Sequence, residues 1–157
     1  MNKKLEFLLR KNDGKLHLQE YINELNRIIN DKQYKILPLE ETDIIMRNIV
    51  EKRNDKPSKI LRNILYMNKV PLKECIKDIF KIDSNKMYVS LGYSNICGMV
   101  MIESILSFNI NILFNDEHSG LIVIYDRNLE NSVIIDSYGD MDIEYYDLEI
   151  IGNKWVM

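Results

Sequence analysis

The sequence of 157 residues lacks the features that mark several large classes of protein. It contains no run of about 18 apolar residues, the length that a membrane-spanning helix needs. Residues 1–6 offer no apolar signal-peptide stretch either, so we expect a cytoplasmic protein that does not bind membranes. Two cysteines, Cys75 and Cys97, are too few for a disulfide framework or a dedicated zinc site.

Alanine is missing altogether, while isoleucine, asparagine and lysine are abundant, as an AT-rich coding sequence would produce. The asparagines are dispersed and no internal repeat is visible, so they indicate neither a prion-like tract nor a binding surface. Apolar residues make up 46% of the chain, enough to bury a core. The length favours a single domain over residues 1–157.

Motifs of the common enzyme classes are absent as well. No glycine-rich dinucleotide loop, Walker A loop, HExxH, GxSxG or EF-hand spacing occurs. The best catalytic candidate is the polar segment 116–120, in which Asp116 and His118 would serve a small hydrolase or nuclease. Neighbours on a turn rarely aim at one point, and no further histidine or cysteine follows to complete a triad or metal site. We therefore expect a hairpin turn there, no metal or cofactor, and no enzymatic activity.

Neither cysteine has the surroundings of a nucleophile. Cys97 lies in the apolar run 96–102 without a basic neighbour that would lower its pKa, and Cys75 falls on an apolar helical stripe. Both are predicted to be small buried hydrophobic residues.

Helical spacing of apolar residues dominates the first half of the chain. It predicts helices over about 15–31 after a turn at 12–14, from Thr42 as a cap to Val50, around Ile60 to Leu65, and onward from Pro71. Residues 1–82 should thus form a layer of about four helices.

After residue 83 the apolar period changes to two. Strands are predicted at 87–91, 108–114, 121–125, 133–136 and 143–151, with turns at 126–131 and 138–142. The clearest alternation is at 108–114, and 121–125 has the pattern of a strand covered on both faces. Residues 96–106 fit a strand or a buried helix, and Gly98 favours the strand. The predicted fold class is α+β, with the N-terminal helical layer packed on a C-terminal antiparallel meander of five to six strands over 83–157.

Basic residues are almost absent from this second half. Residues 83–157 contain 3 basic and 12 acidic residues, whereas residues 1–82 contain 18 basic and 12 acidic ones. A field of one sign steers partners of the opposite sign, although acidic side chains at turns can also serve solubility alone. The short basic stretch around Lys52, Arg53 and Lys56 is predicted to be a solvated face. The acidic half would repel phosphate, so we expect no nucleic acid to bind.

Acidic and aromatic residues are interleaved near the C-terminus. From residue 126 onward there are eight acidic residues and two basic ones, with Tyr138, Tyr145, Tyr146 and Trp155 among them. Tyrosine gives a large contact area at low entropic cost, and carboxylates pair with arginine and lysine. Such a surface suits a basic protein, although Tyr145 and Trp155 fit equally well as core residues of the last strand.

Three segments of this half resemble the small immunity proteins of bacterial polymorphic and contact-dependent toxin systems. They are Leu-Gly-Tyr-Ser at 91–94, Asp-Glu-His-Ser-Gly-Leu-Ile at 116–122 and Ile-Ile-Asp-Ser-Tyr-Gly at 134–139. The resemblance spans about residues 87–155 and is nearest to the partners of LXG-type toxins and of CdiA-like C-terminal domains. It implies a small, acidic, cytoplasmic protein that blocks a nuclease toxin by one-to-one binding. These families share no invariant catalytic motif, so no residue role is carried over.

We therefore expect an immunity protein that covers the basic active-site surface of a cognate toxin. The expected partner-binding residues are acidic and tyrosine side chains of the second half: Asp116, Glu117, Asp126, Asp136, Tyr138, Asp140, Asp142, Glu144 and Tyr146. One alternative is a non-catalytic assembly protein that forms a homodimer through an exposed edge of the meander. The other is the hydrolase or nuclease using the loop from Asp116 to His118.

Overall fold

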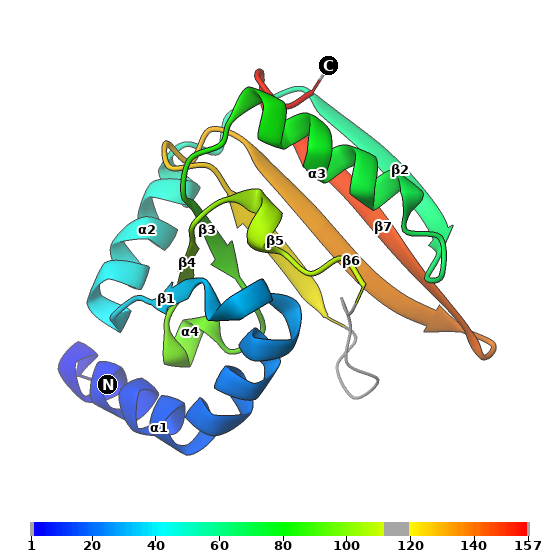
Figure 1. The fold of residues 1–157 in the computed structure, drawn as a ribbon. Coiled ribbons are helices and arrows are strands. Elements are labelled where there is room, and N and C mark those ends of the chain that lie inside the picture. The colour runs from blue at the N-terminus through cyan, green and yellow to red at the C-terminus, as the bar shows by residue number, and fades with distance from the viewer. Residues whose placement is uncertain (1, 112–119, 157) are drawn as a thin grey trace.

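In a computed structural model that describes residues 2–111 and 120–156, the chain forms a seven-stranded antiparallel sheet with helices on both faces (Figure 1). The helices are α1 (Lys3–Ile28), α2 (Leu39–Glu51), α3 (Val70–Ile82) and α4 (Ser94–Cys97), with 3-10 turns η1 (Asn30–Lys32) and η2 (Ile105–Ser107). The strands are β1 (Tyr34–Ile36), β2 (Ser58–Leu65), β3 (Met87–Ser90), β4 (Val100–Ile102), β5 (Leu121–Tyr125), β6 (Ser132–Asp140) and β7 (Ile143–Ile151). Their spatial order is β1-β4-β3-β5-β6-β7-β2. The predicted α+β class is confirmed, with slightly more strands than expected.

The first half of the chain is not purely helical, because it supplies both edge strands of the sheet. The helix predicted around Ile60 to Leu65 is wrong: this segment is β2, which pairs with β7. A bulge between Leu61 and Ile64 inserts one extra residue, so both side chains point into the same core although they are three residues apart. The bulge therefore gives a strand the apolar spacing of a helix.

One face of the sheet is covered by α3 and by the C-terminal half of α1. Tyr21 and Leu25 of α1 and Leu72 of α3 are fully buried there, against inward side chains such as Leu148 of β7. Figure 1 shows α3 lying along β7 and β2. The predicted helix from Pro71 is thus confirmed, and its apolar stripe forms the main core.

Helix α1 begins twelve residues before its predicted start, and the residues 12–14 expected to form a turn lie inside it. Gly14 is needed there for packing: a Cβ atom at this position would lie 2.0 Å from the carbonyl oxygen of Ile96. The glycine thus lets α1 approach the backbone of α4 closely.

Helix α2 covers part of the opposite face, at the end formed by β1, β4 and β3. Its Ile45 packs with Tyr88 and Met99 in a second, smaller core, whereas Val50 is 58% exposed. Thr42 is not the helix cap that the sequence suggested, because the helix starts at Leu39. Its hydroxyl instead accepts a hydrogen bond from the backbone N–H of Met99 at 2.9 Å.

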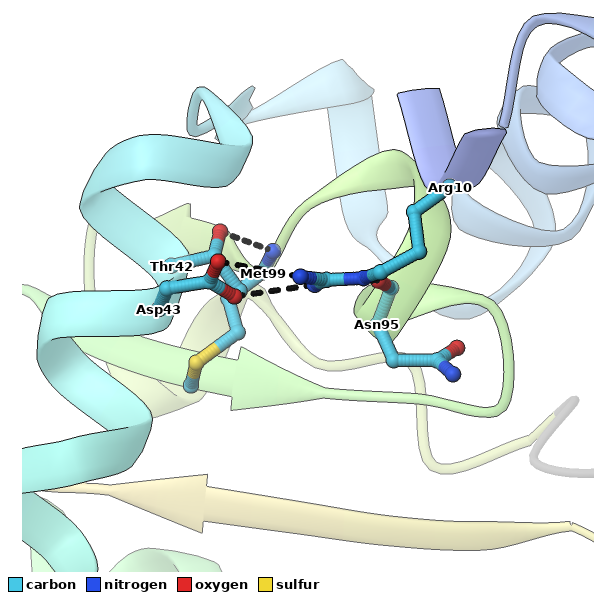
Figure 2. Close-up of polar contacts among 5 residues, drawn as sticks. All are labelled: Arg10, Thr42, Asp43, Asn95 and Met99. Carbon is cyan, nitrogen blue, oxygen red and sulfur yellow. Dashed lines mark hydrogen bonds and ion pairs between the residues drawn. The ribbon is translucent and has the colours of Figure 1, made fainter. Parts of the chain in front are cut away.

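Arg10 joins the N-terminal part of α1 to α2 and α4 (Figure 2). The Arg10 guanidinium donates to both carboxylate oxygens of Asp43, at 2.9 and 3.0 Å, and to the backbone carbonyl of Asn95 at 2.8 Å. The hydrogen bond to Asp43 raises the pKa of Arg10, burial opposes this shift, and the charge of Asp43 adds to it. Paired bonds of this fork geometry fix orientation as well as distance.

Arg10→Ala should therefore loosen the first three turns of α1 while the rest of the fold persists. Because the pair is partly exposed, we expect a loss of about 1 kcal/mol in local stability, which is about fivefold faster amide exchange in this segment. Hydrogen exchange followed by mass spectrometry measures this effect. Lys11→Ala, which removes the more exposed pair of Lys11 with Glu40, is the control and should change exchange little. Equal rates in the two variants would contradict the assigned role of Arg10.

The strand predicted at 108–114 is wrong for residues 108–111. Phe108 forms only an isolated bridge with Ile29, and its side chain is buried in the core. Asn109 donates from its backbone to the carbonyl of Ile28 at 2.7 Å and from its side chain to that of Arg27 at 3.2 Å. The segment thus satisfies carbonyl groups at the end of α1 instead of joining the sheet. Residues 112–119 lie outside the described part of the chain.

The ambiguous region 96–106 contains both kinds of structure. Helix α4 ends at Cys97, and only Val100–Ile102 form the expected strand. The two are separated by Gly98, whose φ of +107° is a conformation that L side chains rarely adopt.

Candidate functional site

On the face of the sheet opposite α3, no described helix covers β6, β7, β2 or the start of β5, whereas Tyr125 at the end of β5 packs in the smaller core beside α2. Apolar side chains are exposed there, with Leu121 at 54% and Ile60 at 43%. We call this surface the open face and define it by the residues that alternate outward on the four strands. They are Leu121, Val123 and Tyr125 of β5; Ser132, Ile134, Asp136, Tyr138 and Asp140 of β6; Ile143, Tyr145, Asp147, Glu149 and Ile151 of β7; and Ser58, Ile60 and Leu65 of β2.

Two carboxylates stand opposite each other in the middle of the open face. Asp136 of β6 is the direct partner of Asp147 of β7 in the strand register. The next outward pair is Tyr138 with Tyr145, whose rings stack with centroids 5.8 Å apart. Like charges directly opposite each other destabilise a sheet. The isolated protein therefore holds a repulsion that a bound cation would relieve.

Asp147 is held in place by neighbouring donors. Its Oδ1 accepts hydrogen bonds from the backbone N–H of Asn63, in the bulge of β2, and from the hydroxyl of Tyr138, each at 2.8 Å. Burial, this bond and the nearby carboxylates of Asp147 and Asp136 raise the pKa of Tyr138, so its hydroxyl remains a donor. The carboxylate of Asp136 makes no hydrogen bond or ion pair with any described residue, and the side chain is exposed.

The fold divides the predicted partner-binding residues among several environments. Asp136, Tyr138 and Asp140 lie together on the open face. Asp142 is exposed in the two-residue turn between β6 and β7, with a φ of +69°. Glu144 lies on the other side of the sheet, close enough for its charge to act on Lys69 of the α3 side. Asp116 and Glu117 fall outside the described residues.

Two of the predicted partner-binding residues are buried, so the prediction that they lie on the binding surface is wrong. Asp126 is 5% exposed, and its carboxylate accepts backbone N–H bonds from Glu130 and Asn131 and a side-chain bond from Asn131. The Asp126 side chain stabilises the β5–β6 loop, because its carboxylate accepts hydrogen bonds from the backbone N–H groups of the turn. Tyr146 is fully buried, and its hydroxyl donates to the carbonyl oxygen of Asn68 at 2.6 Å.

The structure adds acidic residues that the sequence analysis did not select. Asp147 and Glu149 are on the open face, whereas Trp155 is a core residue at 2% exposure. Strand alternation alone could have placed Asp147 and Glu149 on the open face. Residues 145, 147 and 149 point to one face of β7, and the buried residues 146 and 148 point to the other.

No described group shows the arrangement of an activated nucleophile or a metal centre. Burial raises the pKa of the Cys75 thiol to about 12. Burial also raises that of half-buried Cys97, whose thiol donates to the Gly14 carbonyl at 3.3 Å. Within residues 2–111 and 120–156, no three His, Cys, Asp or Glu side chains gather as metal ligands would.

Comparison of the chain with protein-family models, curated proteins and solved structures finds no match. Function must therefore be argued from the site itself. Across the described residues, no helix combines the length and the apolar character that crossing a membrane would require. The edges of the described sheet are β1 and β2, so the homodimer alternative would have to use one of these strands and not β5, β6 or β7.

Proposed function

We propose that the protein is an immunity protein that binds a bacterial toxin with a basic active site, as a nuclease has, and neutralises it by covering that site. The observation that carries the proposal is that Asp136 and Asp147 stand directly opposite each other on a sheet face that no described helix covers at that point. Sequence segments of this half resemble immunity proteins of toxin systems, which supports the same conclusion from a separate direction.

An arginine or lysine of the toxin would suit the space between these carboxylates. A guanidinium forms short, charge-assisted bonds with carboxylate oxygens, and it also stacks on aromatic rings. Tyr138 and Tyr145 supply such rings beside the acidic pair. Enzymes that bind nucleic acid carry clustered arginine and lysine at the phosphate path, so they match this surface in charge.

Inhibition of this kind needs no chemistry from the inhibitor. The acidic surface attracts the basic cleft over a distance set by ionic strength, which speeds encounter at low salt. Once bound, the sheet face excludes the nucleic acid substrate. The proposal therefore agrees with the expectation of a protein without catalytic residues or a cofactor.

Co-expression with the protein encoded immediately upstream tests the proposal. We expect the pair to form a one-to-one complex with a Kd of about 10 nM or below, as measured by titration calorimetry. Growth should be arrested by the upstream protein alone and restored by the pair. A self-dimer that binds no basic partner would contradict the proposal and favour the assembly protein.

A further inference from the structure

Apolar and aromatic side chains adjoin one another at the end of the open face near the β6–β7 turn, which lies far from α2 (Figure 1). Tyr138 of β6, Tyr145 of β7 and Leu65 of β2 form one row across three strands. Ile143 lies two residues before Tyr145, on the same side of β7. Leu65 is 55% exposed and Ile143 is 47% exposed. We call these four residues the hairpin patch. A group of adjoining apolar residues with a polar rim is typical of an interaction surface, whereas single exposed ones are common.

Carboxylates border the hairpin patch on both sides along the strands. Asp136 and Asp147 form the next outward pair on one side of the two tyrosines, and Asp140 follows on the other side. Asp142 is exposed in the adjoining turn. Strands β5, β6 and β7 contain no lysine or arginine, and Arg62, in the bulge of β2, makes no ion pair with any described carboxylate. The rim of the hairpin patch is therefore acidic.

The opposite end of the open face, beside the loop that follows α2, has charges of both signs. Three basic and three acidic residues line the surface there: Lys52, Arg53, Lys56, Asp55, Glu130 and Glu149. The ammonium group of Lys52 is also bound to the carbonyl oxygen of Asn128, at 2.6 Å. Charge therefore favours no particular partner at that end, whereas the acidic rim favours a basic partner at the hairpin patch.

The acidic rim also argues against a second copy of this chain as the occupant. Two hairpin patches placed face to face would bring Asp136, Asp140 and Asp147 of one copy against the same carboxylates of the other. Like charges brought together across an interface disfavour that pairing, and a surface with arginine or lysine around an apolar centre has the opposite preference.

Building on the proposed function, we infer that the toxin docks on the hairpin patch and presents to it an apolar side chain flanked by arginine or lysine. The apolar group gains burial against Leu65, Ile143 and the ring of Tyr145, at the centre of the contact. The basic neighbours pair with the carboxylates of the rim. The two parts act on different rates, because the charges of the rim speed association and the buried centre slows dissociation.

Two truncations in the hairpin patch, each with a matched control, test this inference against the protein encoded immediately upstream. Leu65→Ala and Ile143→Ala shorten the patch, whereas Leu16→Ala on α1 and Ile44→Ala on α2 shorten exposed side chains of the same two types elsewhere. We expect each patch variant to raise the dissociation rate about tenfold and each control to stay within about twofold, as measured by surface plasmon resonance. The association rate and its salt dependence should not change, because no charge is altered.

The outcomes separate this inference from the proposed function. If the wild-type complex forms and both patch variants dissociate at the wild-type rate, the toxin docks elsewhere and the inference is overturned, whereas the proposed function stands. If the wild-type protein forms no complex, both are overturned together. Sedimentation of the protein alone tests for a second copy: a self-dimer that both patch truncations dissociate would also overturn the inference. Circular dichroism of each variant confirms that the fold is retained before the rates are compared.

Discussion

Reversing the charges of Asp136 and Asp140 to lysine should slow association with the toxin by about 10- to 100-fold at low salt. Both carboxylates are exposed on the open face, and two reversals replace an attractive field by a repulsive one where the basic site approaches. The difference from wild type should shrink as salt is added, because exposed charges are screened over about 10 Å at 0.1 M. Stopped-flow association rates over a range of salt concentrations measure the effect.

The fold itself should tolerate this double variant. A lysine at 136 would face Asp147 across the strands, turning a repulsive pair into an attractive one, so thermal stability should be equal to or above that of wild type. The matched control is Glu74→Lys with Asp78→Lys, the same change in net charge on α3, on the far side of the sheet. If the control slows association as much as the open-face variant, the net charge and not the open face governs binding.

Gly98→Ala should destabilise the protein by about 3 kcal/mol or more, a large part of the total for a domain of this size. The glycine has a φ of +107°, and a Cβ atom there would lie 2.0 Å from the backbone oxygen of Leu37. Relief would require the chain to move away from Leu37, whose backbone N–H donates to the carbonyl of Met99 at 2.8 Å. Urea denaturation measures the loss.

Gly92→Ala is the control for this substitution. No heavy atom lies within 4 Å of the Cβ position at Gly92, and this glycine has no positive φ. Its replacement should change the unfolding free energy by less than about 1 kcal/mol, in part by restricting the unfolded chain. Similar denaturation midpoints for the two variants would show that the close approach at Gly98 is not needed.

Several elements could be predicted because local pattern and tertiary role agree. The α3 stripe begins at a proline that suits a helix start and faces the core over its whole length. The β6–β7 hairpin follows alternating apolar residues, although its turn is only Met141 and Asp142, which take positive φ, and not the whole predicted segment 138–142. In both cases the same residues satisfy the backbone and bury the apolar face.

Local pattern failed where a distant segment determined the structure. Leu61 and Ile64 have helical spacing, yet they belong to a strand because β7 offers a partner and a bulge realigns the two side chains. Phe108 begins a regular alternation, yet Asn109 bonds to the end of α1. Asp126 looks like a surface carboxylate, yet it satisfies a loop. In the first two cases a contact remote in sequence outweighs a weak local preference, whereas Asp126 is held by residues of its own loop, four and five positions away.

By itself, the sequence determined the α+β class, the contrast in charge between the two halves and the concentration of acidic and tyrosine residues after residue 126. These are properties of composition and period, which a chain carries before it folds. Only the tertiary structure decided which of those residues share a surface. Strand register places Asp136 opposite Asp147, and none of the helices in the described part of the chain covers the sheet at that point. The same fold buries Tyr146 and brings Arg53 of the loop after α2 close to Tyr125 of β5, because register and layer packing depend on contacts between segments far apart in the chain.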